Sequence, residues 1–158
     1  MPQAFCELSA VSTAPVDTIV RAVLTIATTG EGFFEITGEV IGFLEQIKAR
    51  DGVVLLYLRH TSASLVIQEN ADPDVQVDLV TALRRMAPDD AGWVHKAEGP
   101  DDMPAHIKAM LNGVSLHVPV AAGKMSLGTW QGIYVAEHRV RAHKREVVLQ
   151  FLGSIKDA

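Results

Sequence analysis

Carboxylates and a histidine are concentrated in one eleven-residue stretch, EGPDDMPAHIK, residues 98–108. Asp102 and His106 are four residues apart, so on a helix that includes both residues their side chains point to the same side. Together they could bind one divalent cation or one substrate. Alternatively, Asp101 or Asp102 accepts a hydrogen bond from a backbone amide at the helix start, and spacing alone favours this capping role. Capping accounts for one carboxylate but not for three.

A second polar cluster lies in RHTSASLVIQEN, residues 59–70, between two apolar segments. Its candidate site residues are His60, Thr61, Ser62, Ser64, Glu69 and Asn70. Serine and threonine also bond their own backbone in turns, so a plain hairpin turn explains the segment equally well. The sequence contains no G-x-S-x-G motif, which disfavours serine hydrolase chemistry.

The third cluster is GTWQGIYVAEHRVRAHKR, residues 128–145. On an extended chain, Gln131, Glu137 and Arg139 share one face. The same alternation puts Arg139, Arg141, His143 and Arg145 on one side. Such a row could bind phosphate, because guanidinium groups match phosphate oxygens. A solvated β-ribbon is favoured for Arg141, His143 and Arg145, which leaves Arg139 as the candidate phosphate ligand. His95, in a predicted loop, and His117, on a polar strand face, are expected at the surface.

Length and composition indicate the kind of protein that carries these clusters. A chain of 158 residues most often forms one domain with a real core. The net charge of −5 argues against nucleic acid as a partner. No apolar run approaches the ~18 residues that span a bilayer, and the first residues do not resemble a signal peptide. Cys6 is the only cysteine, so an intrachain disulfide is impossible and a reducing cytoplasm is expected.

Helices and β-strands alternate irregularly along the chain, with more strands than helices. Three helices are predicted: one capped by Thr37, one that starts at Asp72-Pro73, and a short one from about Met103 to Leu111. The run VVLLYLR, residues 53–59, predicts a strand that is buried on both faces. We therefore expect an α+β fold, a single compact domain with a mostly antiparallel β-sandwich or barrel over residues 16–158, and an irregular N-terminal arm over residues 1–15.

Three long blocks of the sequence resemble a known family. HTSASLVIQENADPDVQVDL, EGPDDMPAHIKAMLNGVSLHVP and LGTWQGIYVAEHR are similar to signature blocks of the YjbQ family, also called the secondary thiamine-phosphate synthase or UPF0047 family. GFFEITGEV matches a fourth, shorter block, and the resemblance covers roughly residues 30–153. Lys124 stands where the family usually has arginine. This substitution keeps the charge but loses the bidentate guanidinium.

The resemblance implies a cytoplasmic homotrimer with a weak thiamine-phosphate synthase activity. That reaction joins a hydroxymethylpyrimidine pyrophosphate to a thiazole phosphate and releases pyrophosphate. It also implies a divalent metal, Zn²⁺ or Mg²⁺, near the histidines. The expected metal ligands are His60, His106 and His138; the expected catalytic residues are Glu69, Asp102 and Glu137; and the expected substrate ligands are Thr61, Ser62, Ser64, Asn70, Lys124, Gln131 and Arg139. A regulatory trimer that binds a metal or a ligand, and a metal-dependent hydrolase, remain as alternatives.

Overall fold

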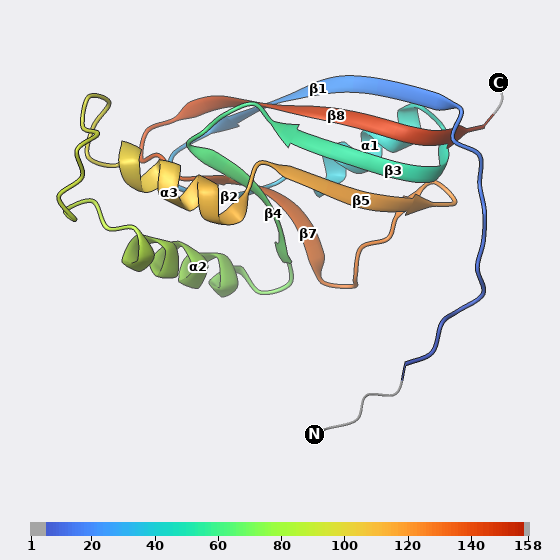
Figure 1. The fold of residues 1–158 in the computed structure, drawn as a ribbon, viewed down its shortest axis with the longest axis horizontal. Helices are drawn as coiled ribbons and strands as arrows, with labels where there is room; N and C mark the ends of the chain where they lie inside the picture. The colour runs from blue at the N-terminus through green and yellow to red at the C-terminus, as the bar shows by residue number, and fades with distance from the viewer. Residues whose placement is uncertain (1–5, 157–158) are drawn as a thin grey trace.

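The computed structural model describes residues 6–156 and has an α+β fold of two antiparallel sheets and three helices (Figure 1). The larger sheet contains, in spatial order, β1 (Thr18–Thr28), β8 (His143–Ile155), β3 (Ala49–Leu58), β5 (Ser115–Ala121) and β6 (Lys124–Met125). The smaller sheet contains β2 (Gly32–Glu35), β7 (Gln131–Glu137) and β4 (Ala63–Glu69). The helices are α1 (Thr37–Gln46), α2 (Pro73–Met86) and α3 (Asp102–Asn112). The predicted fold class is confirmed.

Residues 6–17, which precede β1, contribute neither helix nor strand. Residues 6–17 are exposed and lead away from the sheets (Figure 1); residues 1–5 of the predicted arm lie outside the described residues. Within residues 6–156, no helix is long and apolar enough to cross a membrane.

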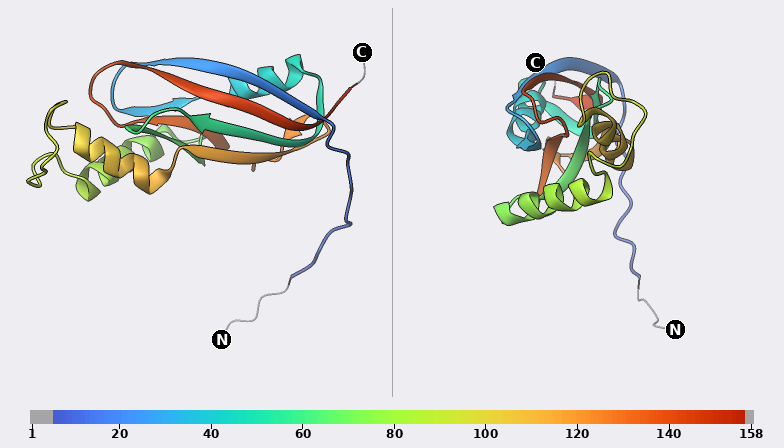
Figure 2. Two further views of the ribbon diagram at one scale, coloured as in Figure 1. Left: turned by 45° about the horizontal axis from the view of Figure 1, so that its top comes forward. Right: turned by 90° about the vertical axis from the view of Figure 1, so that its left-hand side faces the viewer.

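The hydrophobic core fills the space between the two sheets and α1. The inward side chains of the long strands alternate with outward ones, as the two-residue period of a strand requires. Leu56 and Phe151 of the larger sheet meet Leu65 and Val135 of the smaller sheet and Val40 of α1, and all five are at most 1% exposed. The end-on view in Figure 2 places the three helices on different sides of the sheets. This core fixes the strand ends from which the polar clusters project.

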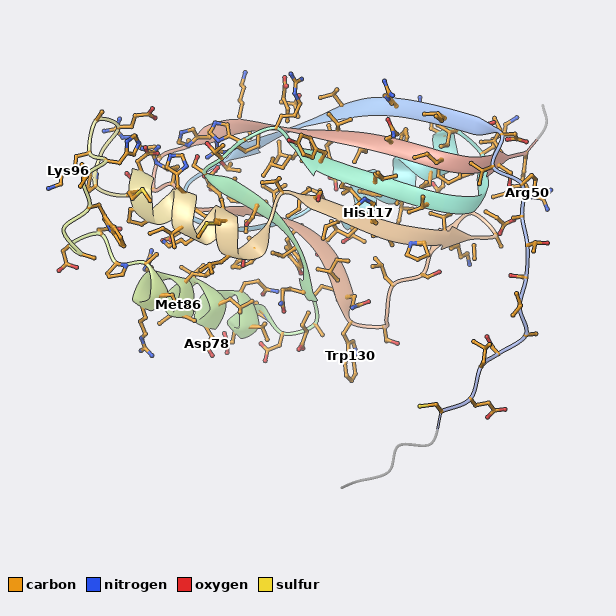
Figure 3. All side chains as sticks on the ribbon, in the orientation of Figure 1. Arg50, Asp78, Met86, Lys96, His117 and Trp130 are labelled. Atoms are coloured by element: carbon orange, nitrogen blue, oxygen red, sulfur yellow. The ribbon has the colours of Figure 1, made fainter. Side chains whose placement is uncertain are left out.

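The outer face of the larger sheet carries several exposed apolar side chains beside polar ones and has no covering layer within the described residues. Ile19 and Val23 of β1 are 60% and 54% exposed, and Tyr57 of β3 is 53% exposed. The prediction that residues 53–59 are buried on both faces is therefore wrong for a single chain, because only the inward residues of β3 are covered. His117 of β5 lies on this outer face (Figure 3), so its predicted surface position is confirmed.

The starts of α1 and α2 are capped in different ways. Asp72 caps α2 as predicted, since its Oδ1 accepts a hydrogen bond from the Asp74 amide at 2.9 Å. The predicted Thr37 cap is wrong, because Ile36 occupies the cap position of α1. The Thr37 hydroxyl instead accepts a hydrogen bond from the Ile133 amide at 2.9 Å. This bond ties α1 to β7 and so helps to fix the smaller sheet.

Candidate metal centre and adjoining pocket

Three chain segments meet beside α3. Ala63, at the start of β4, pairs with Glu137, at the end of β7, and a short turn then leads into β8. Helix α3 packs against β4, and Figure 1 shows the long loop between α2 and α3 at the same end of the molecule. The second and third polar clusters therefore adjoin each other, and both contact the EGPDDMPAHIK stretch.

Arg139 binds the two aspartates at the start of α3. Its Nε donates to Asp101 Oδ2 at 2.9 Å and its Nη1 donates to Asp102 Oδ1. Its Nη2 donates to the Glu98 carbonyl oxygen at 2.7 Å. Asp101 makes no side-chain capping bond, although it occupies the cap position, so the capping role that spacing favoured is wrong. The predicted phosphate-binding role of Arg139 also fails, because this arginine is 6% exposed and its nitrogens are engaged within the protein.

The electrostatics of this cluster favour the ionised form of the Asp101 carboxylate. Burial raises the pKa of Asp101, but the hydrogen bonds from Arg139 and from the Val140 amide outweigh it, so the pKa of Asp101 lies below its ordinary value. Conversely, burial lowers the pKa of Arg139, and the neighbouring aspartates more than restore it, so its pKa lies above the ordinary value. The start of α3 is thus a fixed, charged anchor.

His95, Asp102 and His106 bring their ligand atoms together. These atoms lie within 4.8 Å of one another. Asp102 Oδ2 is 2.7 Å from His95 Nε2 and 3.5 Å from His106 Nε2. The predicted pair of Asp102 and His106 is therefore confirmed as neighbours on one side of a helix. His95 was expected to be a plain surface residue, and its loop carries no periodicity from which its proximity to Asp102 could be deduced.

Surrounding groups orient two of these three side chains. His106 Nδ1 lies 2.9 Å from the Thr61 carbonyl oxygen. Because a carbonyl only accepts, Nδ1 carries the hydrogen and Nε2 keeps its lone pair. Arg139 holds Oδ1 of Asp102, which leaves Oδ2 directed at the histidines. Outer contacts of this kind typically fix metal ligands in proteins.

The three ligand atoms fit a transition-metal ion of the Zn²⁺ type. In a tetrahedral site with bonds of about 2.1 Å, ligand atoms lie about 3.4 Å apart, close to the 3.5 Å between Asp102 and His106. The 2.7 Å between His95 and Asp102 is shorter than this spacing, so His95 must move away from Asp102, and its side chain is 46% exposed on a loop. Two imidazole nitrogens disfavour Mg²⁺, which prefers oxygen ligands.

A pocket of about 630 Å³ adjoins this group. Its lining residues are Tyr57, Arg59, His60, Thr61, His106, Ala109, Met110, Gly113 and Val114. The predicted site residues His60, Thr61 and His106 therefore share one cavity. A second pocket, of about 400 Å³, lies on the other side and is lined in part by Trp93, His95 and Lys96.

Glu137 and Arg145 form a buried ion pair behind the pocket. Both side chains are fully buried, and Arg145 Nε donates to Glu137 Oε2 at 2.7 Å. Thr28 Oγ1 and the Arg139 amide also donate to Glu137, at 2.9 and 3.0 Å. Burial raises the pKa of Glu137, but these hydrogen bonds bring it below the ordinary value. Glu137 has no access to a substrate, so its predicted catalytic role does not fit the structure.

The predicted row of arginines and histidine does not form. The chain turns between Glu137 and His143, which interrupts the alternation on which the row depended. Arg145 is 1% exposed, so its expected place on a solvated ribbon is wrong, whereas Arg141 is exposed as expected.

His138 lies apart from the His95, Asp102 and His106 group, although it was expected to be a metal ligand. It is 2% exposed, and its Nε2 lies 2.7 Å from the Ser64 hydroxyl. Burial, and then the positive charge of Lys108, lower the pKa of His138 to about 4. With its Nε2 engaged by Ser64, His138 is a buried structural residue, and Ser64 is correspondingly withdrawn from substrate.

Acid should destabilise the fold through His138. The unfolded chain takes up a proton on this residue near its ordinary pKa of 6.5, whereas the folded chain does so only near 4. Folding stability should therefore fall as the pH drops from 6.5 to 4, by up to about 3 kcal/mol. Urea unfolding at several pH values checks this. His138→Gln, which cannot titrate, should lose less stability over the same interval, and parallel pH curves for both proteins would contradict the assignment.

Four predicted site residues lie far from the His95, Asp102 and His106 group. Glu69 pairs with Gln131 at the other end of the β4–β7 ladder from Ala63 and Glu137, a separation of about 20 Å along six residues. Figure 3 shows Trp130, next to Gln131, well away from Lys96 in the loop that carries His95. A single chain therefore does not bring Glu69, Asn70, Lys124 and Gln131 to the histidines.

Comparison with known proteins places the fold and its polar clusters in one family. The profile of a family described as UPF0047 protein YjbQ-like matches residues 22–154. The chain is 41% identical to UPF0047 protein sll1880 of Synechocystis over 136 residues, which are 85% of this chain and 92% of that protein. It is also 41% identical to UPF0047 protein YjbQ of Salmonella typhimurium over 131 residues, 82% of this chain and 95% of the relative.

Solved structures give the same result. An uncharacterized YjbQ/UPF0047 protein from Clostridium acetobutylicum is 34% identical, with a TM-score of 0.77, and the match covers 82% of this chain and 98% of that one. The conserved hypothetical protein TT1486 from Thermus thermophilus is 35% identical, with a TM-score of 0.72 and coverage of 80% and 97%. Profile, sequence and structure agree over most of the chain, from β1 to β8, and this protein therefore belongs to the YjbQ (UPF0047) family.

Proposed function

We propose that this protein binds a divalent transition-metal ion, Zn²⁺ foremost, through His95, Asp102 and His106, and that it acts on an anionic small molecule in the adjoining pocket. The observation that carries the proposal is the convergence of three ligand atoms within 4.8 Å beside a cavity of about 630 Å³. Two histidines and one carboxylate with an open remaining position are typical of metal centres that act on substrates.

The pocket walls favour a ligand with a flat or apolar body and an anionic end. Tyr57, Met110 and Val114 provide apolar surface, and Met110 is 76% exposed. Arg59 and His60 provide polar groups in the same pocket. Arg59 has only an exposed partner, Glu146, at 3.3 Å, and exposed pairs of this kind are weak and easily exchanged. A phosphorylated heterocycle matches this lining.

Thiamine-phosphate synthase chemistry, which the family resemblance implies, is compatible with this arrangement. A bound divalent ion would supply positive charge for the departing pyrophosphate. Arg59 and His60 would hold phosphate oxygens, and the apolar wall would orient the ring and limit water. The reaction requires no protein nucleophile, because the pyrimidine methyl group can ionise. This agrees with the burial of Ser62 and Ser64, whose hydroxyls bond other side chains.

The activity test uses untagged protein with hydroxymethylpyrimidine pyrophosphate and thiazole phosphate, with and without Zn²⁺. We expect thiamine phosphate and pyrophosphate in equal amounts, and loss of both products on chelation or in His106→Ala. Pyrophosphate cleavage without thiamine phosphate would favour the metal-dependent hydrolase instead. Binding of metal and substrate without any product would favour a regulatory binding protein.

The homotrimer implied by the family resemblance is also proposed for this chain, with the uncovered face of the larger sheet as the subunit contact. Light scattering should give three times the 17.1 kDa chain mass. Val23→Lys places a charge on that face and should dissociate the trimer, because an unpaired buried charge is costly. Val77→Lys, at a valine of α2 that is 62% exposed against 54% for Val23, is the matched control. A monomeric parent, or dissociation by Val77→Lys alone, would contradict the assignment.

A further inference from the structure

His60 and His106 line the same pocket, but their rings are held in opposite tautomers. His106 Nδ1 donates to the Thr61 carbonyl at 2.9 Å, so the lone pair is on Nε2. His60 Nδ1 lies 3.2 Å from the Ser62 backbone nitrogen, which donates to it. Because an amide N–H cannot accept, Nδ1 of His60 carries the lone pair and the neutral ring has its hydrogen on Nε2.

The Ser62 hydroxyl reinforces this arrangement. It lies 3.1 Å from His60 Nδ1 and accepts a hydrogen bond from Arg145 Nη2, also at 3.1 Å. Because the oxygen accepts from the guanidinium, its own hydrogen is free to be donated to His60. Ser62 itself is 2% exposed, so solvent does not compete for these bonds.

Arg145 cannot leave this position, because Glu137 binds it through Nε and Nη2. Among the described residues, its remaining nitrogen, Nη1, is buried without a hydrogen-bond partner. An unsatisfied buried donor costs stability. The cost falls on Nη1 alone, since Nε and Nη2 bind Glu137 and Nη2 also orients Ser62.

These contacts exclude the metal-ligand role that the family resemblance implied for His60. Coordination through Nε2 would require a hydrogen on Nδ1, and that hydrogen would face the N–H of Ser62. Burial, and then the charge of Arg145, also lower the pKa of His60, which favours the neutral ring. A neutral ring with hydrogen on Nε2 can only donate from that atom.

We propose that His60 is a hydrogen-bond donor of the pocket: its Nε2–H binds an oxygen of an anionic ligand, and Ser62 and the buried Arg145–Glu137 pair hold it in that tautomer. The ligand class is a phosphate or pyrophosphate ester with an apolar body, since Tyr57 and Val114 line the same cavity. The ligand role rests on the proposed function, whereas the tautomer does not. Ser62 and Arg145 are positioning residues, because they act only through His60.

The tautomer is tested by long-range ¹H–¹⁵N spectra of ¹⁵N-histidine-labelled, metal-free protein, with the six histidines assigned by single substitutions. We expect the His60 ring with its hydrogen on Nε2 and the His106 ring with its hydrogen on Nδ1. Ser62→Ala, which keeps the backbone donor, should leave His60 a mixture of tautomers or shift its nitrogen signals. A parent spectrum with the His60 hydrogen on Nδ1 would overturn the proposal.

The ligand role is tested by titration with inorganic pyrophosphate. His60→Ala should weaken pyrophosphate binding by about tenfold or more, since bonds to charged groups are the stronger ones, and should leave the bound Zn²⁺ per chain unchanged. Loss of Zn²⁺ in His60→Ala, or unchanged pyrophosphate affinity, would overturn it. The parent protein could bind no metal and still show the expected His60 tautomer and the expected loss of pyrophosphate affinity in His60→Ala. That result would contradict the metal centre and uphold this inference.

Discussion

Arg145→Met should lower the free energy of unfolding by about 3–5 kcal/mol, because it leaves the carboxylate of Glu137 buried without its partner. Glu137 and Arg145 are both fully buried, so water cannot replace the lost guanidinium. Urea unfolding followed by circular dichroism, at one fixed protein concentration, measures the change.

Two further variants make that result specific. Arg59→Met breaks an exposed ion pair with Glu146, whose side chains are 58% and 52% exposed, and should cost less than about 1 kcal/mol. The double variant Arg145→Met with Glu137→Leu should recover most of the lost stability, since it removes both buried charges. If Arg145→Met lowers the free energy of unfolding no more than Arg59→Met does, the buried ion pair does not stabilise the fold as proposed.

His106→Ala and Asp102→Asn should each reduce bound Zn²⁺ by at least tenfold. Each variant removes or weakens one of three ligands, and the remaining two do not complete a typical site. The fold of His106→Ala should persist, since a domain of this size does not depend on a metal for its core. Asp102→Asn also weakens the buried ion pair with Arg139 and should lower the stability. Equilibrium dialysis followed by elemental analysis measures the metal, and thermal unfolding checks the fold.

Three variants outside the proposed ligand group serve as controls. Asp90→Asn removes an exposed carboxylate from the loop that carries His95, and His117→Ala removes a histidine on the outer face of the larger sheet. Neither should change the metal content. His138→Ala should also retain the metal, because His138 bonds Ser64 and lies outside the ligand group. Equal metal loss in all of these variants would show that the zinc is bound nonspecifically.

The sequence could predict features that depend on short spacing. Asp102 and His106 are one helical turn apart, so their proximity required only the helix, and Asp72-Pro73 marked the start of α2 because cap and proline are adjacent. The order of the predicted elements, with more strands than helices and the helices scattered among them, likewise predicted a largely antiparallel α+β fold. These features are local, and helix and strand periods alone determine them.

The remaining features depend on contacts between distant segments. Arg139 binds Asp101 across 38 residues of chain. Because of this contact, the aspartates at the start of α3 form a salt bridge and do not cap the helix. His95 reaches Asp102 from an irregular loop, for which no periodicity exists. Glu69 and Gln131 share sequence blocks with site residues, yet a strand of seven residues carries its two ends about 20 Å apart. Sequence proximity to a motif therefore overstated the size of the site.

The most direct test of the metal centre is anomalous X-ray diffraction at the zinc absorption edge, from crystals of untagged protein grown with Zn²⁺. The structure predicts one strong peak per chain, about 2.0–2.2 Å from His95 Nε2, Asp102 Oδ2 and His106 Nε2. A zinc peak on His60 or His138, or no peak at the His95, Asp102 and His106 group in crystals that contain zinc elsewhere, would contradict it.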